Sequence, residues 1–211
     1  MQNIRIFSNI PEKIPRYKIL KRLGYHSRKN DVSDEMMSEV DKWITYAADL
    51  IELKALSRRE SIKVSPELKI DIPDMNLSLD SSKLAALLKD SDQLLFMGIT
   101  GGNEIMEEIK KLQAKGEMTA AVIVDAAASE IVDEGFEWIT ALYRKELVRE
   151  GRTLTTRRFS AGYGDFDLEY QKVIYKLLGM KRIDVSITDS CILIPEKSVT
   201  ALCGILKGVD N

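Results

Sequence analysis

The stretch from Arg158 to Asp167, Arg-Phe-Ser-Ala-Gly-Tyr-Gly-Asp-Phe-Asp, combines an arginine, two glycines and aromatic rings that together can hold a ligand. The guanidinium of Arg158 carries five donors in a fixed planar fork, which suits a carboxylate or a phosphate. Gly162 and Gly164 allow the backbone to approach a bound molecule closely or to adopt positive φ, and Tyr163 adds a flat face and a hydroxyl. The same residues also fit a purely structural turn, in which Arg158 belongs to a surface ion pair.

The segments on either side place this stretch at a junction between a strand and a helix. A run with three β-branched residues, Thr153, Thr155 and Thr156, precedes it, and apolar residues at helical spacing follow over residues 168–178. Asp167 is the expected N-cap of that helix, and Gly179 is expected just past its end. Junctions of this kind often present polar groups to a ligand, because the flanking elements hold the loop in place.

The rest of the chain alternates between helical and strand patterns. Helices are expected over residues 17–23, 33–51, 81–88, 104–114 and 117–149, the last as one helix or two. Strands are expected over residues 61–65, 68–72, 94–97, 183–187, 191–194 and 199–205. Pro195 favours a type I turn, so the last two strands are expected to form a hairpin. Because several neighbouring strands can pair antiparallel, we predict an α+β fold: one domain, residues 1–211, with a mixed, largely antiparallel sheet packed against helices.

Two other segments contain residues that are also found in binding sites. Gly98, Gly101 and Gly102 follow a predicted strand and precede a predicted helix, but they lack both the Gly-x-Gly-x-x-Gly spacing and the Lys-Ser/Thr of nucleotide-binding loops. A role in binding phosphate is therefore not expected there. Asp133 and Glu134, on the long predicted helix, fit either a solvated face or a site.

The composition argues against a nucleic-acid-binding protein and against a membrane-spanning protein. The 211 residues include 31 Lys and Arg against 33 Asp and Glu, a formal net charge of −2. A protein that binds nucleic acid usually has more basic than acidic residues, so nucleic acid is not predicted as a partner. No apolar run approaches about 18 residues, so no membrane span is expected. No secretory signal opens the sequence, which favours a cytoplasmic location.

The metal-ligating residues are few. Two cysteines and one histidine do not supply the ligands of a structural zinc site, so no metal site is predicted. Cys191 and Cys203 lie in apolar alternating segments and are expected to be buried thiols. His26 is expected in a partly exposed loop, not as a catalytic base.

The motif Arg158-x-x-x-Gly162-Tyr163 is followed by Ile187-Thr188-Asp189-Ser190, then by Pro195 and Ser198-Val199-Thr200. In order and spacing these residues resemble the C-terminal activation (reactivation) domain of cobalamin-dependent methionine synthase. The resemblance is closest over residues 117–206. It implies an α+β domain that binds S-adenosylmethionine and supports repair of the enzyme, in which inactive cob(II)alamin is reduced by one electron and methylated.

The resemblance also implies which residues hold the ligand. Arg158 would take the carboxylate of the methionyl end, and Tyr163 with the backbone of Ala161, Gly162 and Gly164 would hold the remainder. An acidic residue on the family's long helix contacts the ligand, and Glu134 best matches it.

This sequence departs from the family in three ways. Arg152 stands where the family has an acidic residue, the family continues into a longer tail with another ligand-contacting tyrosine, and the other catalytic modules are absent. His26 is also not part of an Asp-x-His-x-x-Gly pattern, which the family associates with cobalt ligation. The chain is therefore expected to be a stand-alone activation component and not a complete methyltransferase, with cobalamin on a partner chain and an electron donor such as flavodoxin. The alternative is a docking module for a corrinoid protein that no longer binds S-adenosylmethionine.

Overall fold

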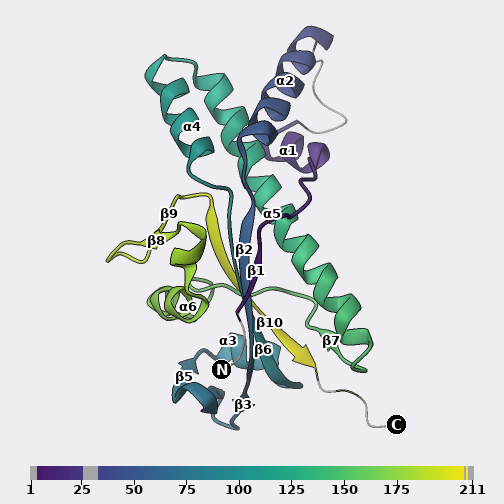
Figure 1. Cartoon of the computed structure of the whole chain (residues 1–211), viewed down its shortest axis with the longest axis vertical. Coiled ribbons are helices and arrows are strands. Elements are labelled where there is room, and N and C mark those ends of the chain that lie inside the picture. The colour runs from purple at the N-terminus through teal and green to yellow at the C-terminus, as the bar shows by residue number, and fades with distance from the viewer. Residues whose placement is uncertain (1–3, 26–32, 207, 209–211) are drawn as a thin grey trace.

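A computed structural model describes residues 4–25, 33–206 and 208 (Figure 1), so His26 lies outside the described residues. Its helices are α1 (Arg16–Arg22), α2 (Asp34–Leu50), α3 (Ser82–Leu88), α4 (Glu104–Ala114), α5 (Met118–Val148) and α6 (Tyr170–Leu178), with short 3-10 turns at Pro73–Met75 and Met180–Ile183. Its strands are β1 (Arg5–Phe7), β2 (Lys54–Ser61), β3 (Lys63–Val64), β4 (Lys69–Ile72), β5 (Leu77–Asp80), β6 (Ser91–Thr100), β7 (Thr153–Leu154), β8 (Ser186–Ile187), β9 (Leu193–Ile194) and β10 (Ser198–Leu206).

The largest sheet has the strand order β1-β2-β6-β10-β7. Its described strand pairs are all antiparallel, and its centre is the long ladder between β6 and β10, which runs from Ser198 opposite Thr100 to Leu206 opposite Ser91. Two small antiparallel sheets, β3-β4-β5 and β8-β9, lie beside it. The predicted α+β fold with a largely antiparallel sheet is confirmed.

The central strands are buried on both faces. Leu95, Met97 and Ile99 of β6 pack in the core that includes α2, α4 and α5. Leu94 and Phe96 point the other way, into the core that includes α3, α6 and the two small sheets. Alternate residues of a strand face opposite sides, so the unbroken apolar run of residues 94–99 is what a two-sided core requires.

The long helical segment is one helix, α5, of 31 residues. Figure 1 shows it crossing the whole length of the sheet, with α2 and α4 beside its N-terminal half. Gly135 allows this close packing, because a Cβ there would lie 2.5 Å from Cδ1 of Ile99 on β6. Among the described residues, no helix combines the length and the apolar character that crossing a membrane requires.

Several predicted elements are confirmed with small shifts. The Oγ of Ser33 caps α2 and the Oγ of Ser81 caps α3, each accepting a backbone N–H of the first turn. Gly179 ends α6 in the left-handed region, with φ of 64°. However, α6 begins at Tyr170, and Asp167 instead accepts a bond from the Glu169 amide just before it. Cys191 and Cys203 are buried free thiols, as predicted.

Two predictions about the strands were wrong. The expected hairpin between residues 191–194 and 199–205 does not form: β9 pairs with β8, whereas β10 pairs with β6 and β7. The reason is burial, since residues 200–205 are all buried and a central position in the large sheet covers both of their faces. Strand β2 was missed because its sequence is largely polar, although Ser57 and Glu60 are fully buried within it.

Candidate functional site

A groove of about 1330 Å³ lies where five segments meet. Its walls come from α3, α5, the loop of residues 157–168 with Gln171 just after it, residues 192–196 including β9, and the first half of β10. The loop of residues 157–168, which contains the Arg158–Asp167 stretch, is called the site loop below. Pockets of this kind, lined by apolar surface with a few polar groups, are the usual places for small ligands in proteins.

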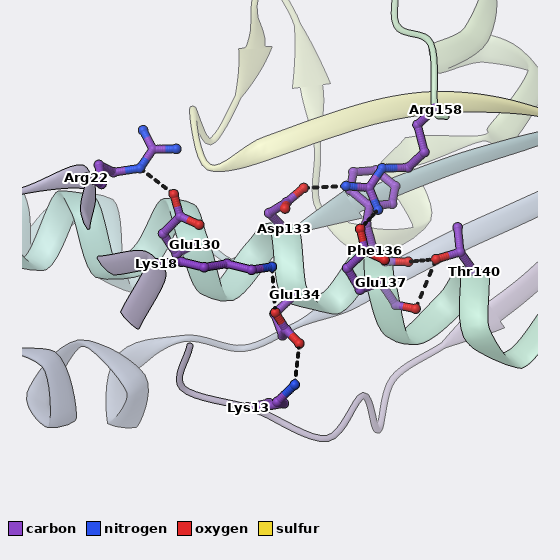
Figure 2. A network of polar contacts seen from close by, with 10 residues as sticks. All are labelled: Lys13, Lys18, Arg22, Glu130, Asp133, Glu134, Phe136, Glu137, Thr140 and Arg158. Carbon is purple, nitrogen blue, oxygen red and sulfur yellow. Dashed lines mark hydrogen bonds and ion pairs between the residues drawn. The ribbon is translucent and has the colours of Figure 1, made fainter. Parts of the chain in front are cut away.

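Arg158 lies in the wall of this groove and faces α5. Its Nη2 donates to Oδ1 of Asp133 at 2.6 Å, and its Nη1 donates to Oε1 of Glu137 at 2.9 Å (Figure 2). The guanidinium carbon lies 5.2 Å from the centre of the Phe136 ring, over its face. Residues three and four apart share one face of a helix, so a single turn of α5 supplies all three contacts. We call Asp133, Glu137 and Arg158 the charged cluster.

The site loop is held by backbone hydrogen bonds. Phe159 exchanges two such bonds with Leu202 of β10, at 2.9 and 2.7 Å. Within the loop, the amide of Gly162 donates to the carbonyl of Phe166 at 2.8 Å, and the amide of Phe166 donates to the carbonyl of Tyr163 at 3.0 Å. Gly162 has φ of 87° and Gly164 has φ of 63°, a region that favours glycine. The turn therefore needs both glycines, and it leaves the Tyr163 side chain 68% exposed at the groove.

Asp165 fastens the site loop to the start of α3. Its carboxylate accepts bonds from the Oγ of Ser81 at 2.6 Å and from the backbone N–H of Ser82 at 2.8 Å. These bonds, with others from the Ser82 hydroxyl and the Lys83 amide, stabilise the ionised form and hold the pKa of Asp165 well below its usual range.

The structure brings most of the predicted site residues together. Arg158, Ala161 and Tyr163 line the groove, and Gly162 and Gly164 shape the turn between and beside them. The ion pair that was the alternative interpretation of Arg158 is also present, in the form of its bonds to Asp133 and Glu137.

Glu134 lies apart from these five residues. Its carboxylate accepts bonds from Lys13 at 2.7 Å and from Lys18 at 3.0 Å, and its side chain is only 12% exposed. The hydrogen bond from Lys13, and then that from Lys18, lowers the pKa of Glu134. Figure 2 shows that Glu134 extends from α5 toward Lys13 and Lys18, whereas Asp133 extends toward Arg158. Of the two adjacent acids considered from the sequence, it is Asp133 that meets Arg158.

Glu137 and Phe136 were not predicted as site residues. The available signal was the i, i+4 spacing of Asp133 and Glu137, which puts two carboxylates on one face of the predicted helix. Arg152 points away from the charged cluster: its Nη2 donates to Oδ1 of Asp92 on β6. It is not part of the groove wall.

The chemistry that this arrangement supports is binding. The charged cluster offers a planar donor fork beside two carboxylates that are each nearly half exposed, so one end of a ligand can pair with both signs of charge. The nearby thiol of Cys203 is not a nucleophile, because burial raises its pKa to about 11 and keeps it protonated at neutral pH.

Comparison with known proteins supports the fold. No family model and no curated protein matches the sequence. Among solved structures, the chain is similar to a crystal structure of the MetH reactivation domain bound to AdoHcy, with a TM-score of 0.67 and 14% sequence identity. The match covers 100% of this chain and 80% of that one. At this identity the match shows the fold and not the ligand, and the chain has the fold of the MetH reactivation domain.

Proposed function

We propose that this protein binds S-adenosylmethionine in the groove beside Arg158 and supports the reductive methylation of cob(II)alamin on a separate cobalamin-carrying chain of methionine synthase. An electron donor such as flavodoxin and a cytoplasmic location belong to the same proposal. The observation that carries it is the position of Arg158, the first residue of the family-like motif, in the wall of a groove of about 1330 Å³, in a fold that resembles a solved structure bound to AdoHcy.

The charges of the groove fit this ligand. The methionyl end of S-adenosylmethionine has a carboxylate, which suits the Arg158 fork, and an ammonium, which suits Asp133 or Glu137. The charged cluster, with two carboxylates and one guanidinium, has a net charge of −1. S-adenosylmethionine carries an additional positive charge on its sulfonium, so its overall charge complements that of the cluster.

The remaining site residues would orient the ligand. Ala161 lines the groove, and Tyr163 presents a ring of which most is exposed. Gly162 and Gly164 leave backbone close to the space that the ligand would fill, and the resemblance assigns these four residues to ligand binding. When bound, S-adenosylmethionine supplies a methyl group activated by the positive sulfur. The task of the protein is to hold that methyl group toward the partner's cobalt.

A second function has one observation in its favour. Arg158 already pairs with two carboxylates, so a ligand carboxylate must share or replace those bonds. A chain that kept the fold for docking on a corrinoid protein, without binding S-adenosylmethionine, would have the same internal ion pairs. The charge complementarity with the whole ligand leads us to prefer the binding function.

Titration calorimetry with S-adenosylmethionine tests the proposal directly. S-adenosylhomocysteine, methionine and adenosine are the comparison ligands, since each lacks the sulfonium charge and the last two lack half of the molecule. The expected order places S-adenosylmethionine tightest, with the two fragments much weaker. An absence of binding at millimolar S-adenosylmethionine would reject this function and leave the docking module as the better account.

A further inference from the structure

Asp165 does not line the groove, yet it makes the densest set of hydrogen bonds in the site loop. In addition to the bonds from Ser81 and the Ser82 amide, its carboxylate accepts the Ser82 hydroxyl at 2.5 Å and the Lys83 amide at 3.3 Å. These donors are the capping residue and the first residues of α3. One carboxylate thus joins the loop of residues 157–168 to an element about 80 residues earlier in the chain.

Further contacts join the same two segments. The hydroxyl of Tyr170, just past the loop, accepts the backbone N–H of Asp80 at 2.9 Å. Its ring stacks on that of Phe166 at a centroid distance of 4.7 Å. Gly164 packs closely on Lys83, because a Cβ at Gly164 would lie 2.7 Å from the Cδ of that lysine. The loop is therefore attached to residues 80–83 on both sides of Asp165.

Asp165 is also placed to fix the ligand-facing turn. It lies between Gly164 and Phe166, and the carbonyl of Phe166 accepts the Gly162 amide. Release of Asp165 would loosen the positive-φ turn that presents Tyr163, because the backbone hydrogen bonds of residues 162–166 are all internal to the loop. A binding loop that is already ordered loses less entropy when the ligand binds, which raises affinity without any additional contact.

We propose that Asp165 is a positioning residue for S-adenosylmethionine, which holds the backbone of Ala161 to Gly164 and the ring of Tyr163 in their binding conformation by anchoring them to the start of α3. The proposal rests on the proposed function. It assigns to Asp165 an effect on affinity that acts through the loop and not through contact with the ligand.

Two variants test this from opposite sides of the anchor. Asp165→Asn keeps the shape of the side chain but removes its charge and one acceptor, and Ser82→Ala removes one donor from α3. Calorimetry is expected to show S-adenosylmethionine affinity lowered by about five- to tenfold for Asp165→Asn, the scale of one or two ordered side chains. Ser82→Ala should act in the same direction by less, and the double variant should be no weaker than Asp165→Asn alone.

Amide hydrogen exchange provides a readout that needs no ligand. In Asp165→Asn, the amides of Gly162 and Phe166 should exchange faster than in the wild type, whereas those of α2 should not change. Ser33→Ala is the matched control, because the Ser33 hydroxyl, like the Asp165 carboxylate, accepts a backbone amide at the start of a helix, but at α2, away from the groove. It should lower stability to a similar extent and leave both the affinity and the loop exchange as in the wild type.

The outcomes separate the two proposals. Wild-type affinity in Asp165→Asn, or an equal loss in Ser33→Ala, would overturn the positioning role while the proposed function stands. If the wild type itself binds no S-adenosylmethionine, the proposed function fails. Amide hydrogen exchange then remains as the test of whether Asp165 orders the loop. Unchanged rates at Gly162 and Phe166 would reject that role, and faster rates would support it.

Discussion

Arg158 is the residue on which the proposed site depends most. Replacing it with alanine removes the fork for the ligand carboxylate, so we expect affinity for S-adenosylmethionine to fall roughly ten- to a hundredfold, or about 1.4–2.8 kcal/mol. Arg158→Lys should restore little, because a lysine ammonium cannot make the planar two-bond contact. Calorimetry on the three proteins measures this directly.

The same substitution should have little effect on folding. The Asp133 and Glu137 side chains are 46% and 47% exposed, so water can solvate them once Arg158 is gone. Exposed ion pairs contribute about 0–1 kcal/mol, and the melting temperature should stay within a few degrees of the wild type. Unchanged affinity in Arg158→Ala would remove this residue from the site.

Asp133 and Glu134 are neighbours in sequence with opposite surroundings, which gives a second prediction. Asp133→Asn should weaken S-adenosylmethionine binding by about tenfold, because an amide no longer attracts the ligand ammonium. Glu134→Gln should change the affinity much less, because this carboxylate bonds to Lys13 and Lys18. Each variant replaces one carboxylate oxygen by an amide nitrogen, so each serves as the control for the chemical change made in the other. The reverse order would return Glu134 to the ligand contact that the family resemblance assigns to it.

Gly162 and Tyr163 make a third prediction about the turn itself. Gly162→Val should abolish binding more completely than Tyr163→Phe, because Gly162 has φ of 87° and a β-branched residue resists that conformation. Phenylalanine keeps the exposed ring. The ranking of the two affinities is the measurement, and a larger loss in Tyr163→Phe would show that the hydroxyl dominates.

At the scale of elements, two glycines in the ladder between β6 and β10 allow neighbouring side chains to pack closely on the sheet. Gly98 lies opposite Thr200 and Gly204 lies opposite Leu94. A Cβ at Gly204 would lie 2.6 Å from the Leu88 side chain and 2.9 Å from that of Thr155, and it would also overlap the Oγ of Ser91. A Cβ at Gly98 would lie 3.0 Å from the flexible end of Met180.

Gly204→Ala should therefore destabilise the fold by about 1–3 kcal/mol, the usual cost of overpacking a core. Gly98→Ala should cost less, since a methionine side chain can move aside. Denaturant titration of both variants measures the difference, each serving as the other's control on the same ladder. Equal midpoints would mean that the core around Leu88 and Ser91 can adjust as easily as Met180 does.

The sequence predicted the elements that carry local signals. Helices α2 and α3 were predicted because apolar residues recur at helical spacing, and α6 because such spacing is followed by Gly179. Strand partners carry no comparable signal: β10 and β9 are close in sequence, but the longest pairing of β10 is with β6, about 100 residues away. Pairing is decided by which strand can be buried on both faces, and local turn chemistry does not report that.

The site residues likewise divide into those with a local sequence signal and those brought together only by packing. Arg158, Ala161, Gly162, Tyr163 and Gly164 lie in one stretch and could be proposed from sequence as a unit. The partners of Arg158 on α5 lie 21 and 25 residues earlier, and only the rotation of that helix decides that Asp133 and not Glu134 faces the loop. A helix turns by about 100° per residue, so a choice between adjacent acids requires the packed structure.

At the scale of the whole molecule, part of the groove wall is exposed to solvent, and the proposed partner must approach it there. Exposed apolar side chains line this part of the groove, among them Tyr163, Leu168 and Ile192. Methyl transfer requires the reacting atoms to be about 3–3.5 Å apart. The sulfonium methyl and the partner's cobalt can meet that condition only if the open side of the groove faces the cobalamin.

The last prediction therefore concerns the complex. With a cognate partner chain carrying cob(II)alamin, a low-potential electron donor and S-adenosylmethionine, addition of this protein should greatly accelerate the formation of methylcobalamin. The visible spectrum of the bound cobalamin reports the conversion. Arg158→Ala is the matched variant: because it weakens binding of the methyl donor, its rate should be low at limiting S-adenosylmethionine and should recover as the concentration rises. Ser33→Ala should behave as the wild type. If methylcobalamin forms at the same rate with and without the protein, the activation role is rejected, whatever the affinity for S-adenosylmethionine, because binding of the donor would then not be coupled to its transfer.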